Sequence, residues 1–180
     1  MNTYENVEIF EDTKRLCEKN EKLKASVAES VKNQKLILES EKLPVVDKKH
    51  FSDEAKVVVS TKRTFEAASG YAGQKVAVHS FASPYKPGGG VLRGAGAQEE
   101  CLCRCSGLYF CLSVPELEKG FYSPHRKAKN PIGTADIIYT PAVTVFKTDT
   151  AKPQLMDEAA WYDVDVITTE VLETRENKKE

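Results

Sequence analysis

The chain has 180 residues, of which 41% are hydrophobic and 29% charged, which is typical of a soluble globular protein with one core. Its net charge of −1 argues against a duplex DNA or RNA binder but leaves room for a polyanion held by backbone N–H groups. It contains neither a secretory-signal pattern at the N-terminus nor an apolar run near the ~20 residues that a membrane span needs. We therefore expect a cytoplasmic protein without a membrane partner.

The first part of the chain predicts two amphipathic helices and a short strand. Apolar side chains recur at helical spacing among charged ones over residues 4–20 and again over 22–33. The compact, β-prone run at 35–39 predicts a strand, and a polar connector containing Pro44 follows it. We interpret residues 1–56 as an N-terminal helical extension of the same domain.

The middle of the chain predicts strands on either side of a short helix. The β-branched run at 57–60 predicts a buried strand, and Thr64 is a suitable N-cap for the helix after it. A strand at 76–81 then leads into a glycine-rich loop. A helix that begins at Gln98 is expected to continue to about Cys111.

The remaining elements predict a mixed sheet. Residues 115–131 predict a short helix and a loop with aromatic and basic side chains. Strands are expected at 136–140 and 143–146, with a surface turn at 147–154 and a last strand that ends at Thr168. Strands that alternate with helices favour an α/β fold with helices on the faces of the sheet.

The residues with chemical potential are concentrated at 81–105, FASPYKPGGGVLRGAGAQEECLCRC. The glycines Gly88, Gly89 and Gly90 allow backbone N–H groups to approach a phosphate or a ribose closely, and a helix N-terminus near Gln98 adds a positive dipole end. The spacing fits neither a Walker A loop nor a Rossmann fingerprint. On spacing alone, a surface loop leading into a helix is the alternative interpretation.

Two adjacent carboxylates, Glu99 and Glu100, stand in the first turn of this predicted helix. Carboxyl groups are natural acid and base groups of hydrolases. Because adjacent helical residues point about 100° apart, this pair cannot face each other across one bond as in ordinary glycosidases. A division of roles is therefore expected, and the alternative is a solvated pair that stabilises the helix dipole.

The cysteines predict small, reduced thiols rather than a metal site. Cys101, Cys103 and Cys105 alternate, and side chains two residues apart on a helix point away from one another. We therefore expect no metal ligation by these residues. His79, in the strand before the loop, is expected to be packed rather than catalytic.

The sequence as a whole resembles a known family. PGGG, a seven-residue spacer and QEE resemble the signature of the poly(ADP-ribose) glycohydrolases. From about Val57 to Thr168, the continuation is similar to the microbial-type branch of that family, in CLCRCSGLYFCL, FYSPHRKAKNP, DIIYTPAVTVFK and WYDVDVIT. The resemblance implies an ADP-ribose-binding macrodomain, which is a three-layer α/β/α sandwich with a mixed sheet.

The resemblance also divides the chain into regions. Residues 57–168 correspond to the macrodomain-like core, and residues 169–180 form a polar tail. In the family, the strand that resembles VDVIT leads into further strands, helices and a second glycine-rich loop. The expectation is therefore that the C-terminal part of the domain is missing from these residues, which would weaken ADP-ribose binding and turnover.

The resemblance implies a role for each site residue. Glu100 corresponds to the catalytic acid, which needs a raised pKa to act near neutral pH, and Glu99 to a group that binds a ribose hydroxyl. Gln98 is expected to position the loop or the helix end. Residues 88–90 are expected to close over the pyrophosphate and distal ribose. Ser83 stands where many macrodomains carry a ribose-binding Asn.

The predicted function is hydrolysis of ribose–ribose O-glycosidic bonds in ADP-ribose polymers, free or on a modified protein, without a metal or redox cofactor. One alternative is a non-catalytic ADP-ribose-binding macrodomain or an inactive remnant. Another is a hydrolase of mono-ADP-ribosylated protein or of a free ADP-ribose derivative. The sequence does not distinguish a polymeric from a mono-ADP-ribose substrate, and it does not predict the oligomeric state.

Overall fold

A computed structural model describes residues 2–42, 45, 53–128 and 133–170. The predicted connector around Pro44 and most of the predicted tail at 169–180 lie outside the described residues. The C-terminal end of the predicted loop within 115–131 does so as well.

The two predicted N-terminal helices are confirmed as α1 (Thr3–Lys19) and α2 (Glu21–Asn33). Asn2 caps α1 by accepting the Tyr4 N–H, and Asn20 caps α2 by accepting two N–H groups of its first turn. In the part of the chain that the structure describes, no helix is both long enough and apolar enough to cross a membrane.

The sheet is mixed, as the sequence predicts. Its described strands are β1 (Lys35–Ile37), β2 (Ala77–Ala82), β3 (Ile137–Val145) and β4 (Tyr162–Glu170), in the order β1-β3-β4-β2. β3 pairs antiparallel with both β1 and β4, whereas β2 runs parallel to β4. The parallel pair aligns Ala77 with Asp165 and so places the carboxyl end of β2, where the glycine-rich loop begins, beside the end of β4.

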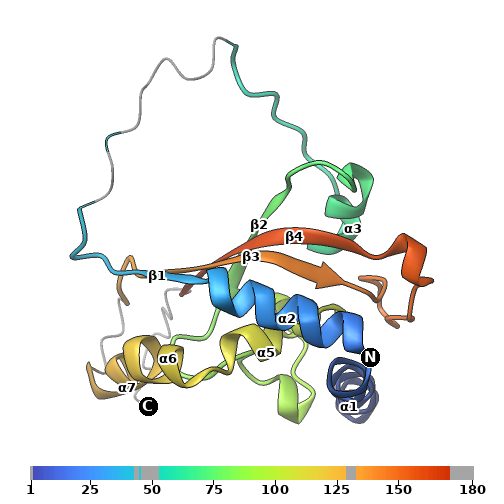
Figure 1. The fold of residues 1–180 in the computed structure, drawn as a ribbon, viewed down its shortest axis with the longest axis horizontal. Coiled ribbons are helices and arrows are strands. Elements are labelled where there is room, and N and C mark those ends of the chain that lie inside the picture. Colours follow the sequence, from blue (N-terminus) through green and yellow to red (C-terminus); the bar gives the residue numbers. More distant parts are fainter. Residues whose placement is uncertain (1, 43–44, 46–52, 129–132, 171–180) are drawn as a thin grey trace, which may run out of the picture.

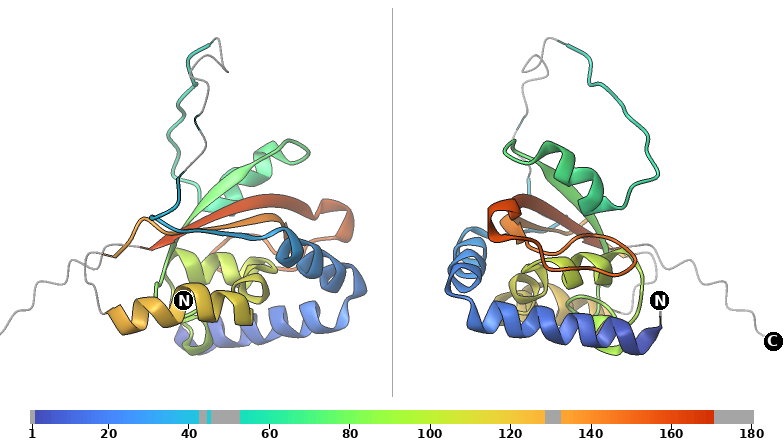
Figure 2. Two further views of the ribbon diagram at one scale, coloured as in Figure 1. Left: turned by 60° about the vertical axis from the view of Figure 1, so that its left-hand side comes forward. Right: turned by 90° about the vertical axis from the view of Figure 1, so that its right-hand side faces the viewer.

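The helices form layers on the sheet. Figure 1 shows α1, α2, α5 (Leu108–Leu112), α6 (Pro115–Leu117) and α7 (Ser123–Ala128) below the sheet and the short α3 (Thr64–Ala68) above it. In Figure 2, α1 runs along the outer side of the lower layer, farthest from the sheet. The largest apolar cluster is built from buried side chains that include Phe10, Phe65, Phe121, Leu102 and Ile138.

The predicted single helix from Gln98 to Cys111 is wrong, because the chain breaks after α4 (Gln98–Cys105). Ser106 is extended, with φ of −148°, and forms a bridge to Val145 next to the sheet. Its hydroxyl donates to the Leu102 carbonyl, which ends α4, and the chain then restarts as α5. A tertiary strand contact therefore overrides the local helical pattern.

Two further predictions in the second half of the chain are corrected. The predicted strands at 136–140 and 143–146 are one strand, β3, with an irregularity between Thr140 and Val143. Pro141 has no backbone N–H to donate to the neighbouring strand. The register shift at this point lets the strand continue past the proline. The predicted loop within 115–131 is helical where it is described, because the wider turn η3 (Glu118–Tyr122) joins α6 to α7.

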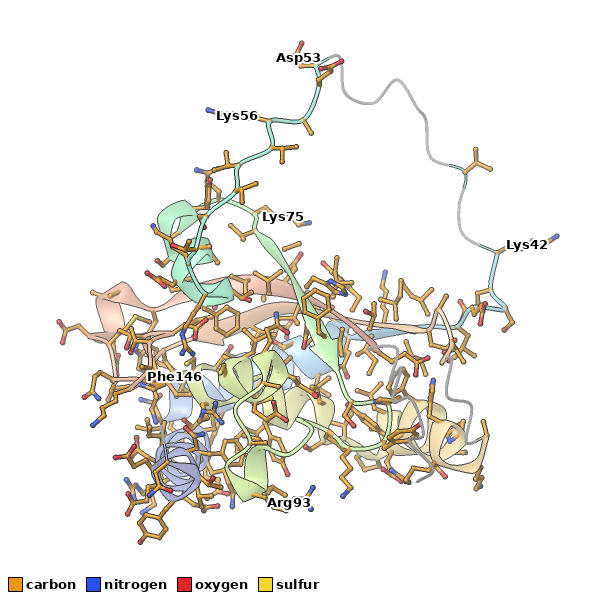
Figure 3. All side chains as sticks on the ribbon, turned by 180° about the vertical axis from the view of Figure 1, so that it is seen from behind. Lys42, Asp53, Lys56, Lys75, Arg93 and Phe146 are labelled. Atoms are coloured by element: carbon orange, nitrogen blue, oxygen red, sulfur yellow. The ribbon has the colours of Figure 1, made fainter. Side chains whose placement is uncertain are left out.

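The buried strand predicted at 57–60 is also wrong. This segment forms no strand, and Val57 and Val59 are 85% and 91% exposed. Figure 3 shows Asp53 and Lys56 well away from the sheet. β-Branched residues favour a strand only when they can pair with an edge and pack on a face, and this segment does neither. The next helix begins one residue earlier than predicted, with Arg63 rather than Thr64 at the N-cap position.

The turn predicted on the surface at 147–154 carries two buried charged side chains, Lys147 and Asp149. The Lys147 ammonium lies 2.8 Å from Asp12 Oδ2 and donates to the Ile9 carbonyl. A buried ammonium needs such partners, and these come from α1, 135 or more positions earlier in the chain. The turn therefore fastens α1 to the end of β3.

Candidate active site

The glycine-rich loop follows β2 and folds back onto the start of α4. Gly88 and Gly89 adopt positive φ angles of +64° and +57°, and the Gly89 N–H donates to the Lys86 carbonyl. A Cβ atom on Gly89 would lie 2.6 Å from Glu100 Oε1 and 2.9 Å from Glu99 Oε2. Glycine is thus needed at this position both for its backbone conformation and for close contact with the carboxyl groups.

Glu99 and Glu100 are buried, with 2% and 6% of their surface exposed, so the interpretation as a solvated pair is wrong. The Ser83 N–H donates to Glu99 Oε2 and the Gly90 N–H donates to Glu100 Oε1, each at 2.8 Å. The other oxygens, Glu99 Oε1 and Glu100 Oε2, have no hydrogen-bond partner among the described residues. Each carboxyl group is therefore fixed through one oxygen, while its other oxygen is buried without a hydrogen-bond partner in the described part of the chain.

A cavity of about 270 Å³ lies over this pair. It brings together three predicted site residues, Ser83, Glu99 and Glu100, and it is also lined by Phe81, Ala82, Pro84 and Ala97. None of these four is a predicted site residue, although Ala82, Pro84 and Ala97 are direct chain neighbours of such residues and Phe81 lies two positions before Ser83. They line the cavity because β2 packs against the start of α4, and the sequence motif does not predict this packing.

Burial raises the pKa of Glu99 to about 8. The Ser83 N–H bond opposes this shift, and the negative charge of Glu100 adds to it. Glu99 is therefore largely protonated at neutral pH and can donate a hydrogen bond, a property that carboxyl groups in water lose above pH ~5.

Within the described residues, the Gln98 side chain forms hydrogen bonds only to groups of β2 and α3. Its Oε1 accepts the Phe81 N–H at 2.9 Å, and its Nε2 donates to the His79 carbonyl at 2.7 Å and to Thr64 Oγ1 at 3.1 Å. These bonds satisfy the outer edge of β2 and tie α4 to it. These bonds agree with the expected role of Gln98 in positioning the helix end. Direct contact between Gln98 and a substrate stays a prediction.

The glycine loop also relies on α1. The Asn6 side chain, which is 4% exposed, donates to the Gly94 carbonyl at 2.8 Å. No motif in the sequence marks Asn6, and only the amphipathic pattern of α1 indicates that this face is buried. The N-terminal helix therefore supports the loop that carries the site. Figure 3 shows Arg93, next to Gly94, at the outer tip of this segment.

The prediction of small buried thiols holds for Cys103 and Cys105, and Cys111 is buried as well; burial raises the pKa of all three. Cys101 differs, because it is only partly buried. Within the described residues, no group of three or more His, Cys, Asp or Glu side chains is arranged to hold a metal ion. The expectation that His79 is packed is wrong: it is exposed on the outer face of β2, where its ring contacts Phe81 and its Nε2 pairs with Thr169 Oγ1.

Comparison with known proteins identifies relatives. The family model described as "Microbial-type PARG, catalytic domain", where PARG is poly(ADP-ribose) glycohydrolase, matches residues 3–148. No curated protein matches the sequence.

The solved structures of two bacterial glycohydrolases match the fold. The poly(ADP-ribose) glycohydrolase of Thermomonospora curvata is 30% identical, with a TM-score of 0.79 over 93% of this chain and 64% of that one. In its complex with the inhibitor ADP-HPD, the same protein has a TM-score of 0.72 at 29% identity, over 94% of this chain and 63% of the other.

The Deinococcus radiodurans glycohydrolase in complex with ADP-ribose is 29% identical, with a TM-score of 0.65 over 81% of this chain and 57% of that one. The chain thus spans somewhat under two thirds of the length of these relatives. The matches confirm the predicted macrodomain-like fold with its mixed sheet. The chain belongs to the family of microbial-type poly(ADP-ribose) glycohydrolase catalytic domains.

Proposed function

We propose that this site hydrolyses the ribose–ribose O-glycosidic bonds of ADP-ribose polymers. The observation that carries the proposal is the pair of buried carboxyl groups, each fixed on a backbone N–H and each with one oxygen lacking a partner. Burial of two adjacent carboxyl groups is costly, and such groups gather at catalytic sites. Relatives of known structure bind ADP-ribose in one case and the inhibitor ADP-HPD in another, which supports this substrate class.

Glu100 acts as the acid and then as the base in this proposal. Its Oε1 is held by the Gly90 N–H, which leaves Oε2 for proton transfer. The carboxyl group protonates the leaving 2′-oxygen as positive charge develops on the anomeric carbon. It then takes a proton from the water that attacks this carbon, so the group returns to its starting state.

Glu99 acts as a positioning group for the substrate. Because burial raises its pKa to about 8, its carboxyl group is mainly protonated at neutral pH. Oε1, which has no partner, can then donate a hydrogen bond to a ribose hydroxyl.

The glycine run has a direct structural role in this proposal. The N–H groups of Gly89 and Gly90 are engaged with Lys86 and Glu100, so these two glycines set the position of the acid. Contact of Gly88, Gly89 and Gly90 with a pyrophosphate stays a prediction, as does contact of Ser83 with a ribose. A cytoplasmic location and a polymer attached to a modified protein also belong to the proposal.

A comparison of substrates tests the reaction. The chain is incubated with poly(ADP-ribose), with a mono-ADP-ribosylated protein and with ADP-ribose alone, while released ADP-ribose is measured by chromatography and binding by calorimetry. We expect ADP-ribose to be released from the polymer. Binding of ADP-ribose without release would identify a binding module instead, and release from the mono-modified protein alone would identify a different hydrolase.

A further inference from the structure

A second cavity, of about 240 Å³, lies on the other flank of α4. It is lined by Arg63, Thr64, Gly96, Gln98, Cys101, Leu102 and Asp149. Neither catalytic carboxyl group lines it, and the proposed reaction uses none of its thiol, guanidinium and carboxyl groups. It therefore calls for an explanation of its own.

Cys101 is the accessible thiol of the chain, since the other cysteines are all buried. The guanidinium groups of Arg63 and Arg104 donate to its sulfur, with distances of 3.5 Å from Arg63 Nη1 and 3.2 Å from Arg104 Nη2. The thiol itself donates to the Gly96 carbonyl at 3.7 Å. Burial raises the pKa of Cys17 and Cys111 to about 12, so those thiols are poor nucleophiles.

Asp149 supplies an independent sign of a ligand in the same cavity. It is 5% exposed, and its Oδ2 accepts the Phe65 N–H at 3.0 Å. Its Oδ1 accepts no hydrogen bond from the described residues, and Arg63 Nη1 lies 3.8 Å from it. A buried carboxylate oxygen without a donor is costly, and a ligand with an N–H group would satisfy it.

The three groups are close together. The same Arg63 Nη1 atom is within 4.0 Å of both the Cys101 sulfur and Asp149 Oδ1. A ligand in the cavity therefore meets a thiol sulfur, a guanidinium group and a carboxylate oxygen that accepts no hydrogen bond from the described residues. Of the small molecules that react with thiols, an amino-acid thiol carries the matching groups: sulfur, carboxylate and ammonium.

We propose that Cys101 is a modification site that forms a mixed disulfide with a small zwitterionic aminothiol. The ammonium group of the aminothiol donates to Asp149 Oδ1, and its carboxylate pairs with Arg63. The Cys101 thiolate attacks one sulfur of a low-molecular-weight disulfide such as cystine. The bond between Cys101 and that sulfur forms as the disulfide breaks, and the second half leaves as a thiolate that takes a proton from water.

Two disulfides test the proposal on the full chain. Cystine is zwitterionic at both ends, whereas bis(2-hydroxyethyl) disulfide is uncharged. Peptide mass spectrometry measures the rate at which each disulfide modifies Cys101 in the folded chain and in the urea-unfolded chain. The ratio of the folded to the unfolded rate removes differences between the leaving groups. We expect the ratio for cystine to exceed the ratio for the uncharged disulfide by about tenfold, the value of one charge-assisted contact.

Variants assign the effect to the cavity. Asp149→Asn keeps an acceptor for the Phe65 N–H and should remove the preference for cystine. Arg63→Gln, at a largely exposed side chain, should slow both reagents, and Cys111→Ser is the matched control that should leave both rates unchanged. Equal ratios for the two disulfides, a preference that survives in both cavity variants, or modification spread over the buried cysteines would overturn the proposal.

Discussion

The two flanks of α4 hold their reactive groups in different ways. On one flank, backbone N–H groups of Ser83 and Gly90 fix the carboxyl groups of Glu99 and Glu100. On the other, the side chains of Arg63 and Arg104 surround the Cys101 sulfur. Because successive helical residues turn by about 100°, one turn of helix can supply two cavities with different chemistry.

The difference teaches which kind of change should damage each flank. The acidic flank depends on backbone geometry, so steric or conformational changes in the glycine loop should disturb it. The thiol flank depends on side-chain charges, so removal of a charge should disturb it while the fold remains. The side chain of Gln98 lines the thiol cavity and is bonded to the strand that leads into the acidic one.

The largest expected effect on stability is the pH dependence caused by Glu99. Its folded pKa of about 8 lies above the unfolded value, so from about pH 5 to 8 the folded state binds the extra proton. The free energy of unfolding should therefore fall as the pH rises, by up to about 1.4 kcal/mol per pH unit. Glu99→Gln should flatten this slope in urea unfolding, whereas Glu8→Gln, on an exposed position of α1, should not. The same slope in Glu99→Gln and in the natural chain would contradict the burial argument.

Gly89→Ala should damage the acidic flank next most strongly. The new Cβ meets both carboxyl groups at under 3.0 Å, and a displacement of about 1 Å at a catalytic group can cost about 10² in rate. Gly73→Ala is the matched control, since Gly73 also has a positive φ, of +86°, but has open space around its Cβ position. Both variants should lose ~1–2 kcal/mol of stability, and Gly89→Ala alone should lose turnover. Equal turnover in the two variants would show that the contact with the carboxyl groups does not matter.

Gln98→Ala should have the smallest effect on turnover and should reach both flanks. It removes three hydrogen bonds, two of them to the edge of β2, each worth roughly 1 kcal/mol in general. We expect a loss of about 2 kcal/mol in urea unfolding, together with a several-fold change in both polymer turnover and the modification rate of Cys101. A change in one rate alone would show that the two cavities do not share this link.

The grouping of Ser83, Glu99 and Glu100 follows from the sequence because its signal is local, while their roles stay predictions. The glycines and the two glutamates stand close together in the chain, and the motif needs only β2 and α4 to bring them into contact. The partners from distant segments carry no such signal. Asn6 reaches Gly94 from α1, and Asp149 reaches the start of α3 from the turn after β3.

The errors in the fold have the same physical origin. The valines at 57–59 have the composition of a strand, but strand formation also requires an edge to pair with. The break after α4 follows from the bridge between Ser106 and Val145, about 40 positions apart in the chain. The periodicity of a sequence indicates which residues prefer to be buried. Whether a segment becomes a strand or a helix also depends on which other segments pack against it.

The most direct test of the central claim compares polymer hydrolysis by the natural chain and by Glu100→Gln. Gln keeps the shape of the side chain and can still accept the Gly90 N–H, but it cannot transfer the proton. We expect release of ADP-ribose from poly(ADP-ribose) to fall by about 10²–10⁴, while the affinity for ADP-ribose changes little and Glu8→Gln retains full activity. Hydrolysis by Glu100→Gln at the rate of the natural chain would contradict the assignment of Glu100 as the acid.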